Sequence, residues 1–373
     1  MPTARPSNYN HIKRNDFHPF RDASLIRQVA DRTFNVRYIS PKDYVVGQVF
    51  YVYPTVRLEC GIIVDSSSDI TFKNVKQRFN YSLALVAQNS ENITLEDSDF
   101  SPGDTEVDFT SFADFMQFSM CRGRIAVRNC NFDAAGDDTC NVHGFHFKIL
   151  EADRNRLVVG FGHNQSYGFE CIRPGDVIAY VNPETLLEEG RAIVSQARLI
   201  DKYRYELTVS SYECPVGVGG VIENVSANPS FEFSGNVINR IVTRGLLVTT
   251  RGKVVIENNR FLNTGASGIL ISDDANNWYE SGCCLDVTIR GNAFMNCEEN
   301  AILIKPEIKK YAGPVHRNIL IENNLFVLNN IHALNVSDSS DIVMKGNVYK
   351  GIPKDNKWIV AKNIRNIVTD CPE

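Results

Sequence analysis

Three aspartates are the residues of this chain whose types and spacing are best suited to chemistry. Asp114, Asp137 and Asp138 occur in the stretch ADFMQFSMCRGRIAVRNCNFDAAGDDTCNVHG, residues 113–144, and the first two are 23 positions apart. Carboxylates that lie close together without cationic partners repel one another, so such a cluster is seldom purely structural. Two carboxylates in different environments can act as the acid and the base of glycoside cleavage. A calcium site and solvated aspartates in turns are the alternative interpretations.

A second polar cluster combines acids, amides and aromatic residues in one expected loop, ISDDANNWYESG at residues 271–282. Loops carried by a rigid scaffold are where binding residues collect. Trp278 would offer an aromatic face to the C–H side of a sugar ring, while Asp274, Asn277 and Glu280 would meet its hydroxyl groups. The alternative is a turn whose tryptophan only covers the edge of the core.

Two further residues stand near these clusters in the expected arrangement. His143 closes the first stretch, and Glu307 lies in the short sequence KPE that opens another long turn on the same side. A lone histidine at the end of a strand is usually a structural hydrogen-bond donor, but His143 could also orient a neighbouring aspartate or a sugar hydroxyl. Both residues are therefore candidates for substrate contact.

These residues must be positioned by a repeated element, and the repeat is visible in the sequence. Five segments alternate apolar and polar residues and then continue as Asn-x-aromatic or Asn-x-aliphatic: FEFSGNVI, VVIENNRF, VTIRGNAF, ILIENNLF and IVMKGNVY. Their asparagines are Asn236, Asn259, Asn292, Asn324 and Asn347, at spacings of 23, 33, 32 and 23 residues. Related segments begin upstream at Ile70, Ile93 and Ile125. The basic unit is 23 residues, and some turns are longer.

The alternation has a period of two residues, which is typical of strands buried on one face. One such unit cannot bury its apolar face alone, so the units must stack. The sequence therefore predicts an all-β fold, a right-handed parallel β-helix whose repeated asparagines form an inward-facing ladder. In this register Asp114 begins a strand, and Asp137 begins the strand stacked directly on it.

Two regions interrupt the repeat. Residues 33–55 and 145–226 read as several strands without the asparagine pattern, and VGQVFYVYP in the first resembles PGDVIAYVNP in the second. We interpret both as small barrel-like modules. The expected organisation is a segment 1–56 with a partial barrel-like module, a first set of rungs in 57–144, an inserted barrel-like module in 145–228, and further rungs in 229–373.

Composition excludes several classes of protein. The chain has 373 residues, 43% of them hydrophobic and 22% charged, with a net charge of −5. A binder of nucleic acid would normally show a basic stripe, and none is visible. No apolar run approaches the roughly 20 residues that a membrane span needs. No apolar signal-peptide segment follows Met1, so localisation cannot be assigned from the residues themselves.

Three of these motifs together resemble those of the bacterial α-1,3-galactosidases. The motifs are ADFMQFSMCRG at 113–123, GDDTCNVHG at 136–144 and GILISDDANNWYESG at 268–282. The resemblance extends from about Arg14 to Gly351. It implies an inverting glycoside hydrolase on a parallel β-helix with barrel-like modules. It also implies exo-acting removal of terminal α-1,3-linked galactose from glycans such as blood-group B structures.

Carried over residue by residue, the resemblance also implies roles for the candidate residues. Asp137 would be the general acid that protonates the departing oxygen, and Asp114 and Asp138 would activate water. Trp278, Glu280 and Glu307 would be the leading contacts to galactose. No metal and no organic cofactor are implied, and the partner would be a galactose-terminated glycan. A periplasmic or extracellular location is suggested, as is a homo-oligomer that covers the N-terminal end of the helix.

Two other classes of function remain open at this point. The first is a non-catalytic, adhesin-like β-helix that binds glycans through a pocket inherited from such an enzyme. The second is a pectate-lyase-type enzyme, which needs carboxylates for calcium together with an arginine or lysine base, and this set cannot be placed in the sequence.

Overall fold

The computed structural model describes residues 20, 23–40, 59–103 and 108–371. Most of the barrel-like module expected near the N-terminus, including VGQVFYVYP, lies outside these residues. The described part of it contains β2 (Thr33–Tyr38), which pairs antiparallel with the preceding strand, β1 (Ala23–Ala30). Within the described ranges, no helix is long and apolar enough to cross a membrane.

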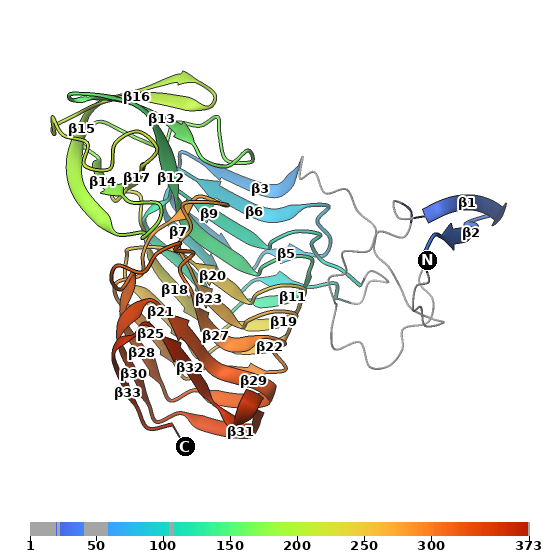
Figure 1. Cartoon of the computed structure of the whole chain (residues 1–373). Helices are drawn as coiled ribbons and strands as arrows, with labels where there is room; N and C mark the ends of the chain where they lie inside the picture. Colours follow the sequence, from blue (N-terminus) through green and yellow to red (C-terminus); the bar gives the residue numbers. More distant parts are fainter. Residues whose placement is uncertain (1–19, 21–22, 41–58, 104–107, 372–373) are drawn as a thin grey trace.

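Three parallel sheets run along a solenoid, so that each turn of the chain adds one strand to each sheet (Figure 1). The first sheet contains β4 (Ser68–Lys73), β7 (Glu91–Glu96), β10 (Arg122–Arg128), β18 (Ser230–Ser234), β21 (Val254–Glu257), β25 (Val287–Arg290), β28 (His316–Glu322), β30 (Ser339–Lys345) and β33 (Arg365–Thr369). The second contains β5 (Lys76–Gln77), β8 (Asp99–Phe100), β11 (Asn131–Ala135), β19 (Val237–Ile241), β22 (Arg260–Thr264), β26 (Ala293–Met295), β29 (Leu325–Ser337) and β31 (Val348–Pro353).

The third sheet carries the residues of interest on its outer face. It contains β3 (Cys60–Asp65), β6 (Leu83–Gln88), β9 (Met116–Ser119), β12 (Cys140–Asp153), β20 (Leu246–Val248), β23 (Ile269–Ile271), β27 (Asn300–Ile304), the second half of β29, and β32 (Ile359–Lys362). A 3-10 helix, Lys354–Asn356, precedes β32. The apolar residues of all three sheets meet in one continuous core.

The predicted asparagine ladder is present. The side-chain amide of Asn236 donates to Asn259 Oδ1 at 3.1 Å, and that of Asn259 donates to Asn292 Oδ1 at 2.9 Å. The series continues through Asn324 to Asn347. Each Oδ1 also accepts the backbone N–H of the preceding ladder asparagine, which satisfies polar groups at a buried corner between two sheets.

The backbone conformation of the residue before each ladder asparagine explains why the sequence repeats Gly-Asn and Asn-Asn pairs. Gly235, Asn258, Gly291, Asn323 and Gly346 all have positive φ, between 55° and 67°. Glycine and asparagine enter this left-handed region at little cost, whereas β-branched residues do not. The chain thus turns inward at this corner once in every rung, and the sequence keeps a residue there that allows the turn.

Aromatic rings form a second stack inside the core. Phe261, Phe294, Phe326 and Tyr349 follow one another with centroid separations of 5.0, 5.2 and 5.4 Å. The spacing is close to the separation of neighbouring strands, about 4.8 Å, because each ring is one rung above the last.

An antiparallel barrel-like module interrupts the helix. Strand β12 begins within the third sheet and then continues into the module, where it pairs with β13 and β17. The module also contains β14, β15 and β16 and has its own apolar core. The new strands are β13 (Arg156–Phe161), β14 (Val177–Val181), β15 (Glu188–Asp201), β16 (Arg204–Val209) and β17 (Val221–Asn224). Because one strand belongs to both parts, the module is fixed beside the outer face of the third sheet (Figure 1).

The predicted register of the aspartates is wrong by one residue. Met116 pairs with Cys140, and the N–H of Phe115 donates to the carbonyl of Asp138 at 3.0 Å, so Asp114 aligns with Asp138 and not with Asp137. The cause is one extra residue in β10: Arg122 pairs with Glu91, 31 residues earlier, whereas Ile125 pairs with Ile93, 32 residues earlier. The turn from Ser111 to Ala135 therefore has 24 residues instead of 23. Asp114 also precedes β9 by two residues instead of beginning it.

Candidate active site

The first residues of β12 present polar side chains to the outside of the third sheet. Cys140 and Val142 point into the core, so Asn141 and His143 point outward. They are flanked by β9 on one side and by β20 on the other. This outer face forms the floor of the candidate site.

His143 is held by bonds at both ring nitrogens. Its Nδ1 lies 2.9 Å from the carbonyl oxygen of Gly144, and its Nε2 lies 3.1 Å from the hydroxyl of Ser119. Since a carbonyl oxygen can only accept, Nδ1 carries the hydrogen. Nε2 also lies 3.8 Å from Glu280 Oε1. The ring of His143 therefore lies next to a carboxylate on the loop that follows β23.

Glu280 reaches the floor because its loop folds back onto β12. Strand β24 (Glu280–Ser281) pairs antiparallel with β12, placing Glu280 opposite Phe145. The side-chain amide of Asn141 donates to Glu280 Oε1 at 3.0 Å. Glu280 is thus fixed over the sheet by Asn141 and by the pairing of β24 with β12.

Arg244 organises the aspartates. Its Nε donates to Asp138 Oδ1 at 2.9 Å and a terminal nitrogen donates to Asp138 Oδ2 at 2.7 Å. The hydroxyl of Thr243 and the backbone N–H of Arg244 also donate to Asp138 Oδ1. Burial lowers the pKa of Arg244, but the carboxylates of Asp138 and Asp137 outweigh that effect and raise it. The arginine is a permanent cation in this site.

Asp137 lies beside the same arginine with more access to solvent. Its side chain is 17% exposed, against 2% for Asp138. Its Oδ1 lies 3.1 Å from the hydroxyl oxygen of Thr243, and a terminal nitrogen of Arg244 lies 4.0 Å away. Of the two adjacent aspartates, Asp137 is therefore the one placed to meet a ligand.

Asp114 belongs to the same corner of the helix. Its carbonyl accepts the N–H of Ala84, and the residue is buried in the rung next to Asp138. Burial raises the pKa of the Cys140 thiol well above its usual value, and the negative charges of Asp114 and Asp138 add to that increase. Both carboxylates therefore lie near the start of β12.

A cavity of about 340 Å³ adjoins this corner. It is lined by Arg244 together with five predicted contact residues, namely Asp274, Asn277, Trp278, Glu280 and Glu307. Thr249 also lines it. The volume lies within the range of small-molecule sites, roughly 300–1,000 Å³. None of the three aspartates lines the cavity; its link to them is Arg244, which holds Asp138 and lies beside Asp137.

Two of the lining residues have clear structural roles. The carboxylate of Asp274 accepts backbone N–H groups from Asn276, Asn277 and Trp278, so it shapes the loop. Trp278 is 56% exposed, and its ring packs against His163 of the barrel-like module, with centroids 4.8 Å apart and planes tilted by 34°. The barrel-like module thus supports the aromatic wall of the cavity.

Sequence reasoning missed Arg244, Asn141, Thr249 and His163. Arg244 could have been found from register, because Cys140 pairs with Leu246 and the same offset places Arg244 on Asp138. Asn141 could have been found from alternation, since it shares a face with His143. Thr249 and His163 carry no local signal. In the part of the chain that the structure describes, no group of three or more His, Cys, Asp or Glu side chains is arranged to hold a metal ion.

The fold and the site define a right-handed parallel β-helix with an inserted barrel and an acidic cavity. Family comparison agrees: the right handed beta helix region matches residues 217–371, and GLAA-B beta-barrel domain II matches residues 156–213. Among solved structures, a family 28 exopolygalacturonase from Yersinia enterocolitica is 12% identical, with a TM-score of 0.36, and covers 82% of this chain and 43% of its own.

Curated relatives then give the family. Alpha-1,3-galactosidase A of Bacteroides thetaiotaomicron is 40% identical over 82% of this chain and 55% of its own length. The corresponding protein of Akkermansia muciniphila is 36% identical over 84% and 52%, and alpha-1,3-galactosidase B of Phocaeicola vulgatus is 32% identical over 87% and 58%. The chain belongs to the α-1,3-galactosidase family. It spans about half the length of these relatives.

Proposed function

We propose that this chain is an exo-acting, inverting glycoside hydrolase that releases terminal α-1,3-linked galactose from glycans, including blood-group-B-like structures. The observation that carries the proposal is the arrangement around Arg244. This one cation holds Asp138, lies beside Asp137, and lines the cavity that also contains Trp278 and Glu280. The names of the curated relatives supply the substrate class.

The three aspartates receive different tasks. Both oxygens of Asp138 are occupied by Arg244 and Thr243, so we assign Asp138 to holding the arginine in place. Asp137 is the partly exposed member, and we assign it as the general acid. Asp114 is then the base that activates water, which gives two carboxylates with separate environments.

The reaction proceeds as a single displacement. Asp137 donates its proton to the glycosidic oxygen while the bond between that oxygen and the anomeric carbon breaks. Asp114 takes a proton from a water molecule, whose oxygen bonds to the anomeric carbon from the opposite face. The products are the shortened glycan and galactose of inverted configuration. Further turnover requires the proton to pass from Asp114 back to Asp137 through solvent.

Recognition of galactose would combine one aromatic face with several polar groups. Trp278 provides the face, and Glu280 and Glu307 accept hydrogen bonds from hydroxyl groups. Among the described residues, Asn141 Oδ1 and Thr249 Oγ1 are buried without a hydrogen-bond partner. Buried polar atoms are usually paired, and Thr249 lines the cavity, so a sugar hydroxyl is a suitable partner for Thr249 Oγ1.

The proposal is tested by following hydrolysis of α-1,3-galactobiose by proton NMR. An exo-acting inverting enzyme releases galactose whose first-formed anomer is β, before mutarotation mixes the anomers. An α anomer first would contradict inversion. Binding of the disaccharide without release would favour the adhesin-like, non-catalytic alternative.

A further inference from the structure

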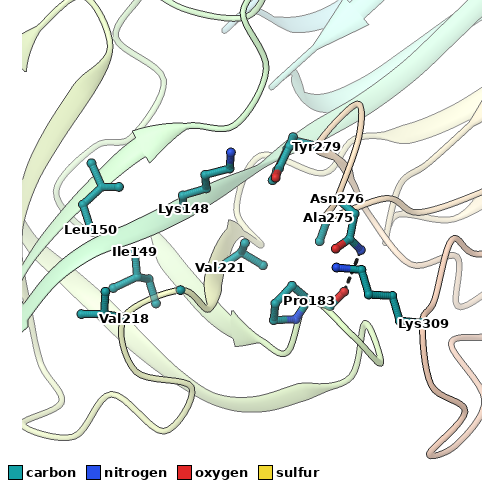
Figure 2. Close-up of a pocket in the computed structure, with 11 residues that line it drawn as sticks. Lys148, Ile149, Leu150, Pro183, Val218, Val221, Ala275, Asn276, Tyr279 and Lys309 are labelled. Atoms are coloured by element: carbon teal, nitrogen blue, oxygen red, sulfur yellow. Dashed lines mark hydrogen bonds between the residues drawn. The ribbon is translucent and has the colours of Figure 1, made fainter.

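The loop after β23 separates two cavities of opposite charge. Asp274, Asn277, Trp278 and Glu280 line the acidic cavity described above. Ala275, Asn276 and Tyr279, which alternate with them in the sequence, line a second cavity of about 440 Å³. We call this second space, between the loop and the barrel-like module, the basic cavity (Figure 2).

Two lysines give the basic cavity its charge. Lys148 comes from β12, and Lys309 comes from the long turn after β27. Figure 2 shows Lys148 beside Tyr279 and Lys309 beside Asn276 and Pro183. No aspartate or glutamate lines this cavity, and in the described ranges neither lysine has a carboxylate within the 4.0 Å of an ion pair. Two cations without a carboxylate partner among the described residues thus face one space.

One of the lysines is held in position. Lys148 Nζ lies 4.4 Å from the centroid of the Tyr279 ring, a cation–π contact. Tyr279 is itself fixed, since its carbonyl accepts the backbone N–H of His146 and its ring packs where Gly162 leaves room for it. The ammonium group is therefore oriented before a ligand arrives, which reduces the entropy lost on binding.

The rest of the lining is apolar. Ile149, Val221 and Ala275 are buried in its wall, while Leu150 and Val218 are exposed. A ligand that fits must combine an anionic group for the lysines with a C–H surface for the aliphatic side chains. Sugars that carry a carboxylate or a sulfate ester have this combination, and the volume suits a ligand of that size.

We propose that the basic cavity binds an acidic sugar residue through Lys148 and Lys309. The choice of a sugar rests on the proposed function, because the loop that forms one wall of this cavity also forms a wall of the galactose site. The acidic cavity repels anions, whereas the basic cavity attracts them. A glycan that contains a neutral galactose and an acidic sugar could therefore place the galactose in the acidic cavity and the acidic sugar in the basic cavity. Both candidate ligands, a sugar with a carboxylate and a sugar with a sulfate ester, are monosaccharide anions.

Calorimetric titration tests the proposal with free monosaccharides, which have no bond to hydrolyse. N-acetylneuraminic acid, galactose 6-sulfate and neutral galactose are titrated into the full chain and into Lys148→Met, Lys309→Met and Lys310→Met variants. Lys310 is the matched control, since it is an exposed neighbour of Lys309 that does not line the cavity. Preference for the carboxylate or for the sulfate identifies the source of the anion.

Each cavity variant should weaken binding of the preferred acidic sugar by about 10-fold or more, because a hydrogen bond to a charged partner is lost. Lys310→Met should leave it unchanged, and added salt should weaken it in the wild type. The proposal is overturned if no acidic sugar binds, or if binding survives both cavity variants. If acidic sugar binds as expected but galactose is not released from α-1,3-galactobiose, the proposed function fails and the basic cavity stands.

Discussion

Arg244 and Asp138 form a two-point ion pair across neighbouring rungs, with nitrogen–oxygen distances of 2.9 and 2.7 Å, although 106 residues separate them in the sequence. The barrel-like module is inserted between them, yet the register of β12 and β20 brings them together. The ion pair therefore links correct stacking of the helix to the geometry of the candidate site.

Removing the Arg244 side chain alone should lower the free energy of unfolding. Arg244→Ala leaves the Asp138 carboxylate buried without its partner, which typically destabilises a protein by about 3–5 kcal/mol. Chemical denaturation of Arg244→Ala, Asp138→Asn and the double variant measures this. The double variant should be less destabilised than the two single changes added together. Additive effects would show that the interaction between Arg244 and Asp138 contributes little to the free energy of unfolding.

The asparagine ladder should carry a comparable share of the stability of the C-terminal rungs. Asn292→Ala removes the acceptor of the Asn259 backbone N–H and leaves buried groups unpaired in two rungs, so we expect a loss of about 2–4 kcal/mol. Asn335→Ala, on the outer face of β29, is the control and should change the free energy of unfolding by less than about 0.5 kcal/mol. Equal effects of the two changes would contradict the role of the ladder.

Stability should fall in mild acid because of His316. Burial lowers the pKa of His316 to about 3, and its Nδ1 accepts the backbone N–H of Cys284 at 3.0 Å, so the folded state holds the ring neutral. The unfolded state takes up a proton below about pH 6.5. The contribution of neutral His316 to the free energy of unfolding is therefore fully present above about pH 6.5. It is lost as the pH falls toward 3, at roughly 1.4 kcal/mol per pH unit.

The corresponding measurement compares wild type with His316→Asn, which keeps an acceptor near Nδ1 but does not titrate. The free energy of unfolding is determined by denaturant titration between pH 7 and pH 5. The variant should be less stable at pH 7 but should lose less stability per pH unit. Parallel slopes would show that His316 does not set this pH dependence.

The sequence predicted the helix because its rungs repeat one local pattern: alternating apolar residues and then a residue tolerant of positive φ, followed in the C-terminal rungs by an inward asparagine. Single-residue irregularities within strands were harder to predict. One extra residue in β10, between Arg122 and Ile125, brings Asp114 into register with Asp138, and a 23-residue period could not reveal that shift.

In the candidate site, too, residues with a local sequence pattern were predicted and residues placed only by the stacking of rungs were not. The loop of Trp278 and Glu280 was recognisable from composition, since acids, amides and aromatic residues are concentrated there. Arg244 lies beyond the inserted module in the sequence, and no local pattern marks it. Its importance appears only when the rungs on both sides of the insertion are stacked.

The direct test of the account is galactose release from α-1,3-galactobiose by wild type and by Asp137→Asn. The amide keeps the size of the side chain and removes the transferable proton, so we expect release to fall by about 10²–10⁴-fold or more, while disaccharide binding and the melting temperature remain close to those of wild type. An aryl α-galactoside should be partly spared, because its leaving group needs little protonation. Equal slowing of both substrates would make Asp137 the base instead of the acid. Wild-type activity of Asp137→Asn on the disaccharide would contradict the assignment of this site.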